Sequence, residues 1–218
     1  MRHALLLLAA CASRLEAAPP VKLAAFAPDA LCVTKGKIAS ARVTVPTLRA
    51  VATSSAGEGA SLSFVFRGDS TRTRELASGE ARRQLGLKLR AENGCNLVYV
   101  MWRLDPKPAL EVSVKLNPGM VTHKDCGADG YTKVKPHHAE PPPELVAGAT
   151  HTLRAEIVGD ELTAWIDDAV AWRGTLPEIA RGLAGPAGLR SDNLAFDLVE
   201  FRAPVARDGR ACRHEDGD

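Results

Sequence analysis

The sequence lacks a strong excess of charge of either sign. Its 28 Lys and Arg residues nearly balance its 26 Asp and Glu residues, which leaves a formal net charge of +2 over 218 residues. A chain this close to neutrality is not expected, as a whole, to bind nucleic acid or a membrane surface. The charge is unevenly placed, because residues 1–138 are net +9 and residues 139–218 are net −7. This asymmetry is expected if the protein has an anion-binding face. It is equally expected if two oppositely charged parts of one fold attract each other.

Long apolar runs and closely spaced cysteines are also missing. No stretch approaches the roughly 18 apolar residues of a transmembrane helix, so no membrane span is expected. No two of the cysteines stand about two to four residues apart, as a zinc knuckle requires. No metal site is therefore predicted from the cysteines.

The N-terminus has the features of an export signal. A charged start precedes the apolar run ALLLLAA at residues 4–10, which is too short to cross a bilayer as a helix. The following motif, LAAC at residues 8–11, resembles the lipobox of bacterial lipoproteins. The resemblance implies a signal peptide over residues 1–10 and a lipid on Cys11. The alternative is an ordinary signal peptide that is cut farther along the chain and discards Cys11.

The residues after the lipobox are rich in alanine and proline, which is typical of a tether rather than a packed element. We therefore expect a lipid-anchored tether over residues 11–30. The protein would then lie in the bacterial cell envelope, on the periplasmic or outer-membrane side. It would contact the membrane only through its lipid.

Four cysteines remain when Cys11 is set aside, an even number in a chain that is expected to be exported. They are Cys32, Cys95, Cys126 and Cys212. Such a count favours two disulfides. Three pairings are open, and spacing alone does not choose among them.

Apolar and polar residues alternate through most of the chain from Val43 onward. In residues 84–91, for example, Leu85, Leu87 and Leu89 would share one face of a strand. The same pattern predicts strands at residues 41–45, 48–53, 60–67, 97–103, 110–116, 152–158, 162–166, 170–173 and 194–201. Short strands separated by turns rich in Gly, Pro, Asn and Asp predict an all-β antiparallel sandwich.

Residues 151–203 carry a more specific order of features. Two short hairpin turns at residues 159–160 and 167–168 are followed by a Leu-Pro helical turn at residues 176–181. The sequence GLRSDN at residues 188–193 then precedes a closing strand. This order resembles the last strands of concanavalin A-like jelly rolls, the superfamily of laminin-G domains and bacterial glucanases. The resemblance implies a jelly-roll β-sandwich of about ten to thirteen antiparallel strands.

The resemblance also bears on domain limits and on the disulfides. It implies one jelly-roll domain over residues 31–218. The terminal strands of this superfamily commonly lie side by side, which implies a bond between Cys32 and Cys212. Two neighbouring antiparallel strands would bring Cys126 toward Cys95, which gives the second pair.

The superfamily contains both binding modules and enzymes, so the fold alone does not decide the function. Retaining glucanases need paired carboxylates on alternate positions of one strand. Neither E-x-D-x-E nor E-x-D-x-x-E occurs in the sequence, and no catalytic residue is assigned.

Basic and aromatic side chains alternate with apolar ones on the strands predicted near residues 84–116. The predicted ligand-binding residues are Lys88, Arg90, Tyr99, Arg103 and Lys115. A sheet face of this composition can bind a carboxylated or sulfated glycan by charge-assisted hydrogen bonds and ring stacking. A solvated sheet face that binds nothing would show the same alternation.

Together these features predict an exported, lipid-anchored module that binds glycan or a component of the cell envelope without catalysis. One alternative is a glycoside hydrolase or related carbohydrate-active enzyme with an unrecognised site. Another is an envelope protein that binds proteins. No cofactor is expected, although Asp192 and Asn193 could contribute to a calcium site. An Asx turn before the closing strand is the simpler interpretation of that pair.

Overall fold

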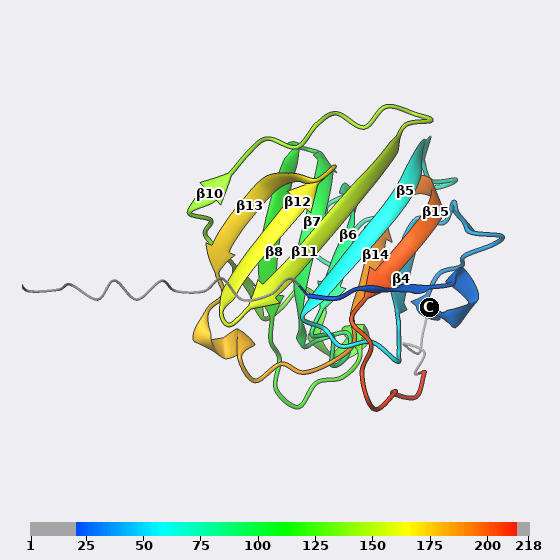
Figure 1. Ribbon diagram of the computed structural model, residues 1–218. Coiled ribbons are helices and arrows are strands. Elements are labelled where there is room, and N and C mark those ends of the chain that lie inside the picture. The colour runs from blue at the N-terminus through cyan, green and yellow to red at the C-terminus, as the bar shows by residue number, and fades with distance from the viewer. Residues whose placement is uncertain (1–20, 213–218) are drawn as a thin grey trace, which may run out of the picture.

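Two antiparallel sheets pack face to face in the computed structural model, which describes residues 21–212 (Figure 1). The eight-stranded sheet runs in the order β1 (Ala24–Phe26), β15 (Leu194–Ala203), β5 (Gly59–Asp69), β11 (Thr150–Val158), β12 (Glu161–Ile166), β13 (Ala169–Thr175) and β10 (His138–Ala139), with β3 (Arg42–Val43) paired to β15. The seven-stranded sheet runs in the order β2 (Cys32–Lys35), β4 (Thr47–Val51), β14 (Gly188–Asp192), β6 (Arg83–Leu89), β7 (Leu97–Asp105), β8 (Ala109–Lys115) and β9 (Tyr131–Lys133). Three short helical segments complete the fold: η1 (Pro28–Ala30), α1 (His123–Cys126) and η2 (Glu178–Ala180).

This architecture is a jelly-roll β-sandwich, so the predicted fold class is confirmed. Every predicted strand is present. The described residues also form five strands that the alternation did not reveal, namely β1, β2, β9, β10 and β14. Four of them have three to five residues and one has two, which is too short for a period of two to stand out.

The core lies between the two sheets and is built by the predicted alternation. Leu85, Leu87 and Leu89 are buried on its side of β6. Across the core, the Phe64 ring meets the Trp102 ring edge-on, with centroids 6.1 Å apart. Each such large side chain contributes roughly 1.5–3 kcal/mol when it is fully buried. The opposite face of the seven-stranded sheet carries polar side chains and a smaller apolar cluster that includes Leu97 and Met101.

The two predicted hairpins of residues 151–175 are confirmed as the β11–β12 and β12–β13 connections. Asp167 and Asp168 adopt positive φ angles of 49° and 65° although neither is glycine. The Asp167 carboxylate accepts hydrogen bonds from the backbone N–H of Thr152 and from His151 Nδ1, both at 2.7 Å. These bonds stabilise the left-handed turn, a conformation that a glycine would adopt without such support.

The chain ends show one departure from the prediction. β1 pairs with β15, with Phe26 opposite Phe201. The sheet therefore begins inside the stretch that was predicted to be a tether over residues 11–30, because backbone pairing to an exposed edge strand orders this alanine-rich segment. Cys11 and the predicted signal peptide lie outside the described residues. Within the described part of the chain, no helix has the length and apolar composition that a membrane span needs.

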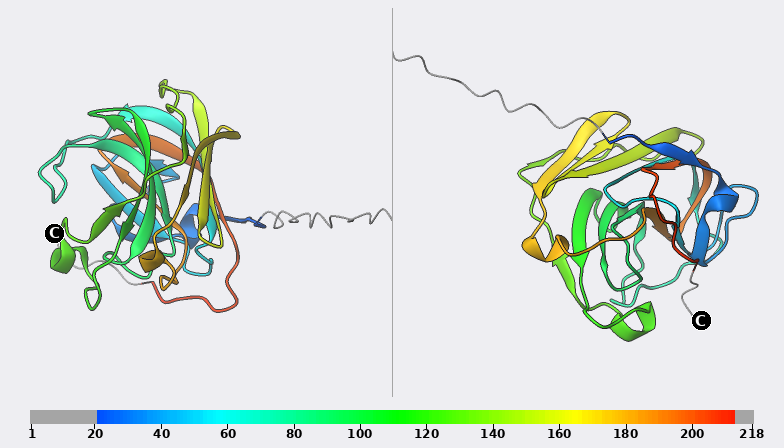
Figure 2. Two further views of the ribbon diagram at one scale, coloured as in Figure 1. Left: turned by 90° about the vertical axis from the view of Figure 1, so that its left-hand side faces the viewer. Right: turned by 60° about the horizontal axis from the view of Figure 1, so that its bottom comes forward.

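Both predicted disulfides are confirmed. The Cα atoms of Cys32 and Cys212 are 5.5 Å apart, and those of Cys95 and Cys126 are 5.9 Å apart. The first and last strands, β1 and β15, pair with each other, whereas Cys32 lies on β2 in the other sheet. The segment after β15 therefore crosses from one sheet to the other before it reaches Cys32, as the second view of Figure 2 shows.

Candidate functional site

The outer face of the seven-stranded sheet holds a cavity of about 570 Å³. We call it the outer-face cavity. All seven strands of the sheet contribute side chains to it. One wall comes from residues 74–78 in the β5–β6 connection, and another from His123, Gly127 and Ala128 at α1. The site is thus assembled from segments that are far apart in the sequence.

Two glycines lie in the strands beneath and beside the cavity. Gly86 lies directly between Arg190 and Met101 in the register of the sheet. A Cβ atom on Gly86 would lie 2.8 Å from the Met101 Cα atom, and one on Gly188 would lie 2.9 Å from the Val51 Cα atom. Neither glycine can carry a side chain without moving the neighbouring strand, so no side chain stands between Arg190 and Met101.

An ion pair lies at the base of the cavity. Arg190 Nε is 2.8 Å from Asp192 Oδ2, and the two side chains are only 6% and 1% exposed. Gln84 Nε2 donates a hydrogen bond to the same carboxylate oxygen at 2.8 Å. Burial would lower the pKa of the Arg190 guanidinium, but the Asp192 carboxylate raises it well above its ordinary value. The guanidinium also stands over the Tyr99 ring, 5.0 Å from the centroid.

The other oxygen of this carboxylate has a different environment. Asp192 Oδ1 is buried and has no hydrogen-bond partner among the described residues. A buried acceptor that is left without a partner costs free energy, so such an atom is unusual in a folded protein. Asp192 as a residue lines the cavity.

A row of positive side chains crosses three strands beside this pair. Arg49 stands directly opposite Arg190, and Lys35 stands directly opposite Arg49. Both arginines are buried, and all three residues line the cavity. Like charges that face each other across strands repel, and in this row the Asp192 carboxylate compensates Arg190.

The far end of the cavity holds a second charged group and the aromatic rings. Arg103 Nη1 lies 2.9 Å from a Glu111 oxygen, and Lys133 bonds the other oxygen of that carboxylate. The Tyr99 and Tyr131 rings stack at an angle of 19°, with centroids 6.1 Å apart. Tyr131 remains 41% exposed, so part of its ring is open to a ligand.

The cavity is lined by only two of the five residues that were predicted to bind a ligand. Tyr99 and Arg103 line the cavity. Lys88 is buried on the same sheet face but is not among the lining residues. Arg90 does not continue the alternation of β6, because its φ of 46° turns the chain and its guanidinium donates to the Ala180 carbonyl at 3.1 Å. Lys115 is fully buried beside the wall rather than in the cavity.

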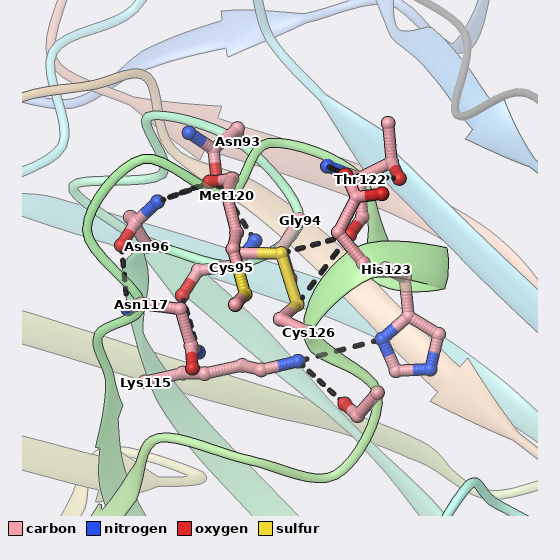
Figure 3. The surroundings of a disulfide bond; sticks show 12 residues. Asn93, Gly94, Cys95, Asn96, Lys115, Asn117, Met120, Thr122, His123 and Cys126 are labelled. Carbon is pink, nitrogen blue, oxygen red and sulfur yellow. Dashed lines mark hydrogen bonds between the residues drawn. A yellow bond between two sulfur atoms is a disulfide. The ribbon is translucent and has the colours of Figure 1, made fainter.

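Lys115 supports the wall formed by α1. Its Nζ donates to the Gly127 carbonyl oxygen at 2.8 Å and lies 3.4 Å from His123 Nδ1 (Figure 3). The Cys95–Cys126 disulfide ties the end of α1 to the start of β7 in the same region. This part of the wall is therefore held by one covalent bond and one buried ammonium group.

Asparagine side chains complete the same support. The backbone N–H of Asn117 donates to Asn96 Oδ1 at 2.8 Å, and Asn96 Nδ2 donates to the Met120 carbonyl at 2.8 Å (Figure 3). At the start of α1, the Thr122 hydroxyl donates to the Asp125 carboxylate at 2.7 Å, which lowers the pKa of Asp125. These bonds order a segment that the sequence alone presents as a long loop.

Asn193, one of the two residues considered for calcium, holds the other wall. Its Oδ1 accepts the Arg74 N–H at 2.7 Å, and its Nδ2 donates to the carbonyls of Arg74 and Arg82 at 2.8 and 2.9 Å. Its partner in that prediction, Asp192, bonds Arg190 and Gln84 instead. Over residues 21–212, no group of three or more His, Cys, Asp or Glu side chains has a geometry that could hold a metal ion.

Sequence reasoning missed most of the cavity. The cavity residues that it did not select for ligand binding include Lys35, Arg49, Gln84, Glu111, Arg190 and Asp192. The available signal was the alternation of Arg190 and Asp192 with Leu189 and Ser191, in a run of only five residues.

Comparisons with known proteins bear on the fold. No protein family profile and no curated protein sequence matches this chain. The carbohydrate-binding module CBM66 from Bacillus subtilis superposes with a TM-score of 0.53 and 11% sequence identity, over 81% of this chain and 94% of that chain. A tetrameric galectin from the ball sponge Cinachyrella sp. has a TM-score of 0.43 and 15% identity, over 68% and 92% of the two chains. The Crh5 transglycosylase in complex with NAG has a TM-score of 0.45 and 16% identity, over 88% of each chain. The CBM66 similarity supports the jelly-roll fold.

Proposed function

We propose that this protein is an exported module that binds carbohydrate, or a carbohydrate component of the cell envelope, in the outer-face cavity. The observation that carries the proposal is the cavity itself, which joins hydrogen-bonding side chains to an exposed tyrosine on one sheet of a jelly roll. A cavity lined by a few oriented polar groups is typical of small-molecule sites. The structural neighbour CBM66 is described as a carbohydrate-binding module, which supports the same assignment.

The cavity offers groups that suit a sugar. Gln84 and Asp192 supply an amide and a carboxylate for hydroxyl groups. The open part of the Tyr131 ring can stack on the C–H face of a pyranose. Polar contacts would set the orientation of the sugar, and the ring would contribute apolar contact area.

We propose binding rather than hydrolysis for this site. A retaining glycosidase needs one carboxyl group as an acid and another as a nucleophile, about 5 Å apart. Two of the three cavity carboxylates, Asp192 and Glu111, are instead held in salt bridges. The two disulfides support the exported location, because such bonds persist in oxidising compartments.

A glycan array followed by calorimetry tests the proposal. We expect binding of one class of oligosaccharide without release of product, and a loss of about tenfold or more in affinity for Tyr131→Ala. Val199→Ala is a matched control, because Val199 is exposed on the eight-stranded sheet away from the cavity. Product release would favour the glycoside hydrolase alternative, and a protein ligand without glycan binding would favour a protein-binding role.

The lipid anchor on Cys11 is a separate part of the proposal. Mass spectrometry of the membrane fraction should find a mature chain that begins at a lipid-modified Cys11. Cys11→Ala should leave the chain unprocessed or release it from the membrane. A mature N-terminus farther along the chain and without lipid would contradict the anchor but not the carbohydrate site.

A further inference from the structure

The lining of the outer-face cavity reaches both edges of the seven-stranded sheet. The edge strands are β2 and β9, and Lys35 and Lys133 line the cavity from them. Neighbouring strands of a sheet lie about 4.8 Å apart, so a path that crosses all seven strands is about 29 Å long. A single sugar ring is far too short to follow that path from end to end.

The long dimension of the cavity runs across the strands rather than along them (Figure 1). A row of residues crosses the sheet from β2 to β8, and each member lies directly opposite the next in the register of the sheet. Glu111, the last member, forms an ion pair with Lys133 on β9, which completes the crossing. All members except Gly86 line the cavity. In order, the row consists of Lys35, Arg49, Arg190, Gly86, Met101 and Glu111.

The two walls of the cavity stand at opposite ends of the strands. Residues 74–82 precede β6, and residues 123–128 follow β8. Because β6 and β8 both run antiparallel to β7, the start of β6 and the end of β8 lie at opposite ends of the sheet. Within residues 21–212, every lining residue outside the seven strands belongs to one of these walls. The lining therefore includes no segment that closes the cavity at β2 or at β9.

Side chains at both edges are accessible to solvent. The Lys133 side chain is 70% exposed, and Lys35 is half-buried. Lys35 and Arg49 keep their own interactions within the protein in this arrangement, because only their positions along the row matter. A ligand that lies along the row can therefore extend past either edge strand.

We propose that the outer-face cavity binds an internal stretch of an extended polysaccharide chain, which crosses the strands and leaves the cavity at both β2 and β9. Several consecutive rings contact the row, and neither end of the chain has to enter. A site for a chain end would instead need a closed side that holds the terminal ring. This inference rests on the proposed function and specifies the form in which the carbohydrate is bound.

A ladder of fragments tests the inference with the full chain. The probes are size-separated fragments, from a single ring upward, made by partial acid hydrolysis of a polysaccharide that binds on the glycan array. We expect the affinity to rise by about tenfold or more with the number of rings, and to level off once a fragment spans the row. Long fragments that carry a bulky group on either terminal ring should bind as tightly as the unmodified fragment.

The outcomes separate the inference from the proposed function. Equal affinity for the shortest and longest fragments would overturn the inference and leave carbohydrate binding intact. The same holds for a loss of binding when one terminal ring is blocked, and for an array that shows binding of short glycans but of no polysaccharide. An array without any bound glycan would contradict the proposed function and the inference with it.

Two obstructing variants test whether the ligand crosses the sheet. Thr47 on β4 and Ser113 on β8 both line the cavity, and four strand intervals, about 19 Å, separate their strands. We expect Thr47→Trp and Ser113→Trp each to weaken binding of the long fragments by about tenfold or more, because a crossing chain has to pass both positions. Thr163→Trp is the matched control, since Thr163 is half-buried on β12 of the other sheet.

A ligand confined to one side of the cavity would be affected by only one of the two substitutions, and that result would overturn the inference. Circular dichroism and thermal unfolding verify that each variant folds. Thr47→Gln and Ser113→Gln repeat the comparison with smaller side chains if a tryptophan variant does not fold, and the fragment ladder needs no variant.

Discussion

Asp192 holds Arg190 with one carboxylate oxygen and leaves the other oxygen without a partner, in a position that is almost completely buried. Both residues line the outer-face cavity, so the pair is part of its base. Removing one charge of a buried pair leaves the other charge buried without a partner, which typically costs about 3–5 kcal/mol of stability.

We predict that Asp192→Asn lowers the free energy of unfolding by an amount in that range, about 3–5 kcal/mol, because it leaves the Arg190 guanidinium buried beside a neutral amide. Chemical denaturation of both proteins measures the difference. Asp208→Asn is a suitable control, since Asp208 is exposed near the C-terminus. A loss of less than about 1 kcal/mol would show that the pair contributes no more than an exposed one.

Asn193 allows its hydrogen bonds to be tested apart from its backbone conformation. Its φ is 56°, which glycine adopts without strain. We predict that Asn193→Gly removes three side-chain hydrogen bonds, lowers stability by about 1–3 kcal/mol and loosens residues 74–82. Hydrogen exchange should show faster exchange in that segment, and ligand affinity should fall. Unchanged exchange there would contradict the role of Asn193 as the anchor of this wall.

The Cys95–Cys126 bond closes a loop of 31 residues. In the chain-entropy description, a loop of this length contributes about 3–4 kcal/mol to stability. We predict that the double variant Cys95→Ala, Cys126→Ala loses about that amount and binds ligand more weakly, because α1 forms part of the cavity wall. Thermal unfolding and calorimetry measure both effects. Full affinity in a folded double variant would show that the bond serves stability alone.

The carboxylate of Asp197, on β15 of the eight-stranded sheet, should make the stability of the fold depend on pH. Hydrogen bonds from Arg42 and Arg67 lower its pKa from 3.8 to about 2. Because the folded value is the lower one, the carboxylate stabilises the fold above the unfolded pKa. That contribution is lost as the pH falls toward about 2. We predict a titration near pH 2 for Asp197 in NMR spectra of the wild type. In Arg67→Gln the titration should move upward, and a midpoint near 3.8 in the wild type would contradict the prediction.

The alternation of apolar residues predicted the strands, the direction of the leucines in β6 and two members of the cavity, Tyr99 and Arg103. It could not predict the Arg49–Arg190 contact, because that contact depends on β14 lying between β4 and β6 although it is nearly last in the chain. Strand order follows from packing over the whole sandwich, not from any local pattern. Arg90 was misplaced for a local reason, since its positive φ ends the alternation one residue after β6.

The Cys32–Cys212 bond determines which part of the molecule would carry mechanical load. It closes a ring over a sequence separation of 180 that contains all of the cavity residues. Tension between the two ends of the described chain would pass from Cys32 to Cys212 through the sulfur atoms and bypass the sheets inside the ring. The cavity could then keep its shape while the protein is pulled. Reduction of this one bond would shift the force to the strand pairings inside the ring, beginning with β2 and β4.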